Sequence, residues 1–255
     1  MAVDFVVKWV NGSSTFTLSD PYDVTDFGED EVRYRIPSAD AIGTDGEYQE
    51  DSFADPRTVW LSGMIISTSA DALRTSWQTF AKAFAKGTAG QLYKSSDRYI
   101  NGRVFSLHRD MDEGLNYVNW SLVIRAYDPW WYDSSISTNS LSLSGSVSIA
   151  AGGTYPALPI ISIQVTVVGP GTFTITNGTT GQAFTITPNV IGLYQIDCSA
   201  GTVTVNGSTD GISLFSGSFW DMGFLPDAQT ITTSTTGGCT MSAASLLWRR
   251  RYSVA

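Results

Sequence analysis

One aromatic stretch, residues 127–133 (YDPWWYD), most constrains how this chain can fold. The apolar run just before it predicts a buried β-strand. Pro129 ends that strand or confines it to a sheet edge, because proline has no N–H group for a β-ladder. Trp130, Trp131 and Tyr132 would form a costly patch if they were exposed together. We therefore expect these three side chains to pack at a junction between two units of structure.

Charge is distributed unevenly on the two sides of this junction. Residues 1–133 hold 12 of the 15 Lys and Arg residues and 20 of the 24 Asp and Glu residues. Residues 134–248 contain no Lys or Arg, and three Arg residues follow at 249–251. We therefore predict two domains, residues 1–133 and 134–255. The net charge of −9 argues against specific nucleic-acid binding, which depends on Lys and Arg contacts with phosphate.

The N-terminal residues lack the basic and apolar regions of a secretory signal. No uninterrupted apolar run approaches the roughly 18 residues that suggest a membrane span. The two cysteines, Cys198 and Cys239, form no disulfide framework and no CxxC metal spacing, although a bond between them stays open. We expect synthesis in a reducing cytoplasm and no insertion into a membrane.

The first domain begins with a predicted β-hairpin and continues into a long loop. Two β-favouring runs within residues 3–18 flank Asn11-Gly12, which suits a tight hairpin turn. Residues 20–56 are acidic and rich in turn residues, and only 32–36 predict a strand there. Loops of this length are usually functional, and we expect this one to be an arm that grips a neighbouring subunit. Tyr48 and Phe53 are its candidate assembly residues.

A strand and the one clear helix follow the loop. Residues 57–66 predict a strand with Trp60, Met64 and Ile66 on one face. Residues 69–86 predict a helix that Thr68 or Ser69 can cap and that Gly87 ends. Its apolar stripe can dock on a sheet and consists of Leu73, Trp77, Phe80 and Phe84. Strands are then expected at 91–94, 99–107 and 117–127, with a turn or bulge at Asn101-Gly102. The first domain is therefore predicted as α+β, with mostly antiparallel strands.

The second domain is predicted to be all β. A linker begins it, and short β-favouring runs separated by Gly, Pro and Asn turns then follow one another, which is typical of a sandwich or barrel. The expected strands are 160–168, 171–176, 183–187, 193–198, 202–206, 212–215 and a last one at 242–252. The fold class is accordingly mainly β, with a sandwich in the second half.

No group of residues predicts an active site, a metal site or a cofactor site. His108 is the single histidine, and no Gly-x-Ser-x-Gly motif accompanies it, so a serine triad has little support. Acid pairs could serve a glycosidase, but chance pairs are inevitable among 24 carboxylates. Trp220, next to Phe219, could stack on a sugar, although such residues more often belong to a core. We therefore expect a structural or binding protein and not an enzyme.

The order of these features resembles the distal tail protein (Dit) family of long-tailed siphophages. The resemblance covers nearly the whole chain, and it lies in the order of motifs that are each weak alone. These are the hairpin with Trp9 and Asn11-Gly12, Arg57 before a strand ending Leu61-Ser62-Gly63-Met64-Ile65, the single helix, the Asp128–Tyr132 junction, Asn177-Gly178 with Gly181, and Leu247–Tyr252. At 226–229 the chain has Pro-Asp-Ala-Gln, where such sandwiches often carry a different turn. The His, Asn and Arg set of true galectins is also missing.

This resemblance implies a structural virion protein at the distal end of a phage tail. It implies an N-terminal ring-forming (belt) domain in a hexamer around a channel for DNA passage, and a galectin-like or jelly-roll second domain. The implied partners are the tail tube protein and the tail-associated, receptor-binding or fibre proteins of the tail tip and baseplate. Trp130, Trp131 and Tyr132 would then be interdomain residues. The alternative is a carbohydrate-binding adhesin that contacts host glycans through Trp220.

Overall fold

The computed structural model describes residues 7–35, 38–40, 47–49, 53–110, 116–208, 211–219 and 223–254. The chain divides into two compact units, residues 1–134 with 253–255, and residues 135–252. The last residues thus fall with the first unit, whereas the sequence assigns them to the second domain. Both units consist mainly of antiparallel strands, which confirms the predicted fold class.

A single antiparallel sheet organises the first unit. Its strands follow the order β2-β1-β9-β10-β11-β8-β3, and β12 pairs with the first residues of β10. The bounds are β1 Val7–Asn11, β2 Ser14–Leu18, β3 Tyr22–Glu29, β8 Arg57–Ile66, β9 Ala89–Tyr93, β10 Arg98–Asp110, β11 Tyr117–Ala126 and β12 Trp131–Asp133. The N-terminal hairpin is confirmed, and Gly12 has the positive φ of 58° that its turn requires.

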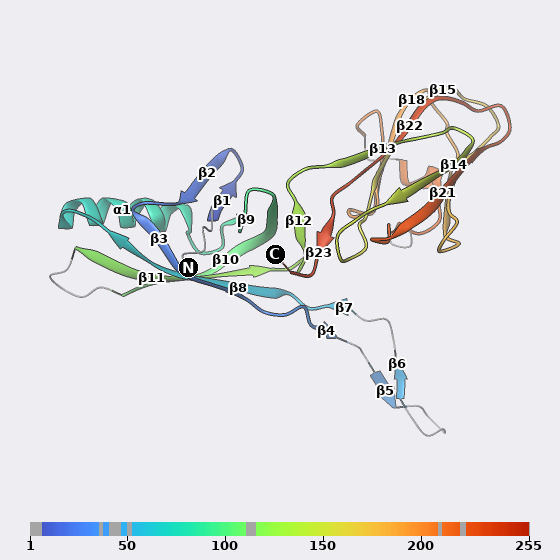
Figure 1. Ribbon diagram of the computed structural model, residues 1–255. Helices are drawn as coiled ribbons and strands as arrows, with labels where there is room; N and C mark the ends of the chain where they lie inside the picture. The colour runs from blue at the N-terminus through green and yellow to red at the C-terminus, as the bar shows by residue number, and fades with distance from the viewer. Residues whose placement is uncertain are drawn as a thin grey trace. The chain divides into compact units, whose positions relative to one another are not determined.

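Helix α1 (Ala70–Ala83) covers one face of this sheet (Figure 1). The Ser69 side chain caps the helix by accepting a hydrogen bond of 3.3 Å from the backbone N–H of Ala72. Leu73, Phe80 and Phe84 of the predicted stripe are buried. The Phe80 ring lies 4.8 Å from that of Trp120 on β11. The helix ends at Ala83, earlier than predicted, because the backbone at Phe84 is no longer helical.

The predicted turn or bulge at Asn101-Gly102 is wrong, because both residues pair regularly with β9. The irregularity of β10 lies between Val104 and Ser106.

Trp60, Met64 and Ile66 of β8 share one face, as predicted. Arg57, Val59, Leu61, Gly63 and Ile65 are the buried positions, so Trp60, Met64 and Ile66 lie on the opposite face. Trp60 is 39% exposed, and its indole lies against Gly28 of β3. Gly28 has no side chain, so the neighbouring strand can accommodate the ring outside the core.

The region expected to be one long loop contains an edge strand and two short ladders. Residues 22–29 form β3, which pairs with β8 from Tyr22↔Ile65 to Glu29↔Val59. Beyond it, β4 (Tyr34–Arg35) pairs with β7 (Phe53–Ala54), and β5 (Ser38–Asp40) pairs with β6 (Glu47–Gln49). This nested pairing extends the β3–β8 connection into a hairpin away from the sheet (Figure 1). We call residues 30–56 the arm.

Two five-stranded antiparallel sheets form the second unit and confirm the predicted sandwich. Their orders are β13-β22-β15-β18-β19 and β14-β21-β16-β17-β20. The bounds of these ten strands are β13 Ser137–Leu141, β14 Gly145–Ala150, β15 Ile160–Val167, β16 Phe173–Asn177, β17 Ala183–Ile186, β18 Gly192–Asp197, β19 Thr202–Val205, β20 Phe215–Ser216, β21 Ala228–Thr235 and β22 Thr240–Trp248. The short strand β23 (Arg251–Tyr252) follows β22 along the chain and belongs to neither sheet. Alternate residues of both sheets form one buried apolar core. The galectin-like or jelly-roll assignment stays a prediction.

Three predictions for the second unit need correction. Strands β13 and β14 lie where a linker was expected, and β21 was missed. The predicted strand at 212–215 is mostly a 3-10 helix, Gly211–Leu214. The predicted last strand is divided at residues 249–250 into β22 and β23. Cys198 and Cys239 are buried free thiols, so they form no bond with each other.

Candidate assembly site at the root of the arm

The aromatic residues of the junction lie at one end of the first unit's sheet. Trp130 and Trp131 are buried, and Tyr132 is partly buried. The Tyr132 ring stacks on Tyr99 at 5.8 Å, and its hydroxyl donates a hydrogen bond to the Asp128 carboxylate. Trp131 packs beside Phe27 of β3, with 6.3 Å between the ring centroids. These contacts all lie within the first unit, and the predicted role between domains stays a prediction.

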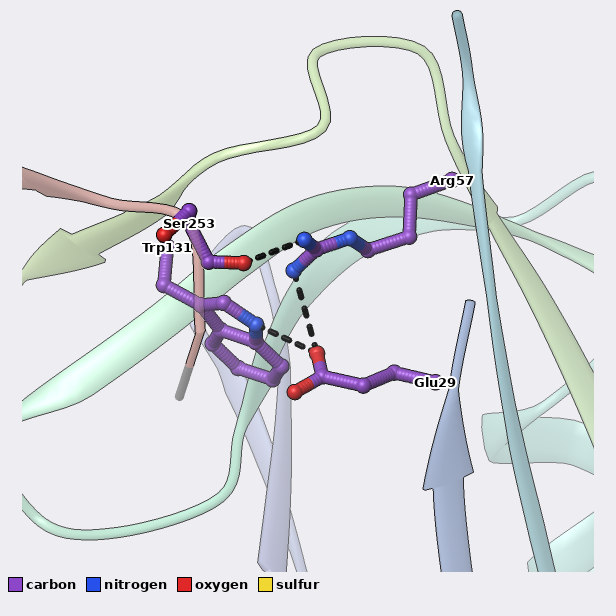
Figure 2. A network of polar contacts seen from close by, with 4 residues as sticks. All are labelled: Glu29, Arg57, Trp131 and Ser253. Carbon is purple, nitrogen blue, oxygen red and sulfur yellow. Dashed lines mark hydrogen bonds and ion pairs between the residues drawn. The ribbon is translucent and has the colours of Figure 1, made fainter. Parts of the chain in front are cut away.

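A buried arginine connects Trp131 to the end of β3. Arg57 begins β8 and is only 2% exposed. Its Nη1 donates to Glu29 Oε2 at 3.1 Å, and its Nη2 donates to the backbone carbonyl of Ser253. Trp131 Nε1 donates to the same Glu29 oxygen at 2.6 Å. Figure 2 shows these four residues converging, and we call them the Arg57 network.

The electrostatics of the Arg57 network follow from its burial. Burial lowers the pKa of the Arg57 guanidinium, and the negative charges of Glu29 and Asp30 oppose that shift. Arginine nevertheless stays charged, so the Glu29 carboxylate is needed to compensate it. Within the described residues, the buried Arg57 Nε has no hydrogen-bond partner.

The arm starts immediately after this network. The Asp30 N–H donates to the Thr58 carbonyl at 2.9 Å, and the Asp55 N–H donates to the Arg33 carbonyl at 2.8 Å. Arg35 donates from Nε and Nη2 to one Asp55 carboxylate oxygen at 3.2 and 3.0 Å. The side chains of this ion pair are 68% and 39% exposed, so it contributes at most about 1 kcal/mol.

A polar hollow of about 370 Å³ lies at the root of the arm. Three guanidinium groups and three carboxylates line it together with a proline: Arg33, Arg35, Arg125, Asp30, Glu31, Asp55 and Pro56. Charged groups that remain accessible can make charge-assisted hydrogen bonds to a polar partner. The hollow therefore offers both hydrogen-bond donors and acceptors.

A second, shallower hollow of about 590 Å³ lies over β1, β9 and β10. Gly90 and Gly102 are paired across β9 and β10 and are among the residues that line it. Tyr127 at its rim is 64% exposed.

The other predicted site residues are distributed as follows. Trp220 lies outside the described residues, so its glycan role stays a prediction. Phe219 beside it is 8% exposed and stacks on Phe215 at 4.2 Å, which makes it a core residue. For Tyr48 and Phe53 the structure describes the backbone, in β6 and β7, and their assembly role stays a prediction. His108 is exposed on β10.

The described residues contain no group of three or more His, Cys, Asp or Glu side chains arranged to hold a metal ion. In the same part of the chain, no helix is long and apolar enough to cross a membrane.

Sequence reasoning missed the roles of Glu29, Arg57 and Ser253. Arg57 was noted only as the residue that leads into a strand. Alternating apolar and acidic residues at 22–29 (YDVTDFGE) were the available signal, because edge strands often carry charged side chains. The contact with Ser253 joins residues 196 positions apart, and no local pattern predicts it.

Comparison with known proteins gives a match by structure alone. No family model matches the sequence, and no curated protein matches it. The crystal structure of SPP1 Dit (gp 19.1), described as a hub adsorption apparatus of phages that infect Gram-positive bacteria, matches with a TM-score of 0.71. The identity is 13%, and the match covers 98% of this chain and 99% of SPP1 Dit. The phage p2 baseplate in its activated conformation gives 0.49 at 9% identity, covering 96% and 98%. The predicted resemblance is confirmed: the chain has the fold of SPP1 Dit.

Proposed function

We propose that this chain is a structural virion protein, the hexameric distal hub of a phage tail. It joins the tail tube to the tail-tip or receptor-binding apparatus and leaves a channel for DNA passage. The protein is made in the host cytoplasm and acts at the distal end of the tail, without catalytic activity of its own. The match to SPP1 Dit over almost the full length of both chains carries this proposal.

The first unit has features that suit a ring. β2 and β3 form the two edges of its sheet, and the arm emerges beside the β3 edge. The two edges differ in chemistry, since β2 is uncharged whereas β3 carries Asp23, Asp26 and Glu29. A surface with two different ends suits head-to-tail association, which gives a ring when the rotation closes. In this proposal the arm grips the next subunit, with Tyr48 and Phe53 among its contacts.

Removing the arm tests its role in assembly. In the variant, a short Gly/Ser linker replaces residues 40–52, and the main sheet and its core lie outside the replaced segment. We expect folded monomers, because the segment that reaches the neighbour is gone while the core is intact. Circular dichroism and thermal unfolding check the fold, and light scattering on a sizing column gives the mass.

A matched control changes an exposed surface of the second unit. Ser146, Ser148, Thr230 and Thr232, all exposed on β14 and β21, are replaced by Ala. This control is expected to assemble as the unmodified chain does. Intact rings from the arm variant would refute the proposed role of the arm.

A further inference from the structure

Three segments that are distant in sequence meet in the Arg57 network. Glu29 is the last residue of β3, and the arm begins at the next residue. Trp131 begins β12, which ends just before the chain leaves the first unit at Ser134. Ser253 is the residue at which the chain returns to the first unit. Arg57 binds Glu29 and Ser253 directly and reaches Trp131 through the Glu29 carboxylate.

The bonding pattern makes these contacts interdependent. The planar guanidinium sends its two Nη groups to different segments, which a lysine ammonium on a flexible stem does not reproduce. Glu29 Oε2 accepts from both Arg57 and Trp131, so moving Glu29 removes an acceptor from two buried donors at once. Buried donors without acceptors are costly, and a buried charge without its partner is costlier. Loss of one member is therefore costly, because it leaves a buried charge or a buried donor without its partner.

We infer that Arg57 is a positioning residue that couples the root of the arm to both chain connections of the second unit. A partner that displaces the arm and moves Glu29 weakens the hold on Trp131 and Ser253. Conversely, movement of the chain at Trp131 or at Ser253 weakens the contacts at the root of the arm through the Arg57 network. The inference concerns the single chain, and it holds whether or not the chain forms a ring. Its outcome is thus separate from that of the proposed function.

Backbone amides next to the network report this coupling through hydrogen exchange. Asp30 N–H, bonded to Thr58, and Asp55 N–H, bonded to Arg33, report on the arm root. Ser134 N–H donates to the Asp97 carbonyl at 2.7 Å and reports on the connection to the second unit. Amides of Leu122 and Ile124 in β11 report on the core, because both residues are fully buried.

The first test is Arg57→Lys, followed by hydrogen exchange with mass spectrometry on the full chain. The variant keeps the positive charge and loses the planar guanidinium, whose two Nη groups donate to Glu29 and Ser253. We expect exchange to accelerate about tenfold or more at the arm root and at Ser134 together, which is the size expected for a lost charged hydrogen bond. The core peptide with Leu122 and Ile124 should exchange as before.

Arg35→Lys is the matched control. Arg35 is also an arginine paired with a carboxylate, but among the described residues its side-chain hydrogen bonds go to Asp55 within the arm. Exchange should change at the arm root and remain as in the unmodified chain at Ser134.

Trp131→Phe tests the coupling from the other side. It removes one N–H donor and keeps an aromatic ring, at a position 102 residues away from Glu29. We expect faster exchange at Asp30 as well as at Ser134. Unchanged exchange at Asp30 would contradict the coupling. Equal acceleration of every peptide, including the core, would also overturn it, because Arg57 would then only stabilise the fold. If Arg57→Lys does not fold, Trp131→Phe decides the question.

Discussion

Arg57 and Arg35 show how burial decides what an ion pair does. Both arginines bind a carboxylate near 3 Å, but the Arg57 side chain is 1% exposed and the Arg35 side chain is 68% exposed. Removing one partner of a buried pair costs about 3–5 kcal/mol, while an exposed pair contributes about 0–1 kcal/mol. At the residue scale, the buried pair therefore fixes the position where the arm starts. The exposed pair of Arg35 and Asp55 adds only a weak contact to the pairing of β4 with β7.

Cys198 gives a prediction on the pH dependence of stability. Burial, together with the negative charge of Asp197, raises the pKa of its thiol from 9.0 to about 12. Below pH 9 both the folded and the unfolded chain keep this proton. Between pH 9 and 12 the unfolded chain releases it first, so the free energy of unfolding falls as the pH rises.

Chemical denaturation at a series of pH values from 8 to 11 checks this prediction. Above pH 9, deprotonation of Cys198 in the unfolded chain should lower the free energy of unfolding by up to about 1.4 kcal/mol per pH unit. Cys198→Ala creates a small cavity that lowers the free energy of unfolding similarly at every pH. It also removes the contribution of Cys198 to the slope of that free energy against pH. Equal slopes in the unmodified chain and in Cys198→Ala would show that the thiol makes no such contribution.

At the element scale, the sequence predicted the elements whose pattern depends on local chemistry. The hairpin around Gly12, helix α1 and strand β8 all follow from turn residues, capping and periodicity. The shared face of Trp60, Met64 and Ile66 on β8 was also predicted, whereas the contact of the Trp60 ring with Gly28 depends on another strand. β3 was missed because Asp23, Asp26 and Glu29 make it look like an acidic loop. Such charges are tolerated at a sheet edge, and only the pairing with β8 shows that this segment is a strand.

Gly63 is the residue on which the close approach of β3 to β8 depends. A Cβ atom there would lie 1.9 Å from the Asp23 carbonyl oxygen and 2.5 Å from the Trp120 ring. Gly63→Ala should therefore push the edge strand away and lower the free energy of unfolding by about 1–3 kcal/mol or more. Urea denaturation followed by tryptophan fluorescence measures the change.

Gly178→Ala is the control for this prediction. Its added Cβ would lie 3.4 Å from the nearest heavy atom, the Thr230 carbonyl oxygen, so little strain is expected. A Gly63→Ala variant as stable as Gly178→Ala would mean that β3 does not pack on β8 as closely as described.

At the scale of the whole molecule, the fold is shared with SPP1 Dit although only 13% of the residues are identical. This structural similarity depends on the order of the elements along the chain, and the order of the sequence motifs reflects it. The candidate assembly site was predictable only in part. Trp131 was singled out as an aromatic residue at the junction. Its partners Glu29, Arg57 and Ser253 come together through long-range contacts that no spacing in the sequence encodes.

The mass of the purified protein in solution tests the proposed hub most directly. Light scattering on a sizing column should give about six times the chain mass of 27.5 kDa, and negative-stain images should show a ring with a central hole. A ring of this mass is the result expected of the proposed hub. A monomer at 27.5 kDa that stays monomeric when mixed with tail tubes and tail-tip proteins would contradict it.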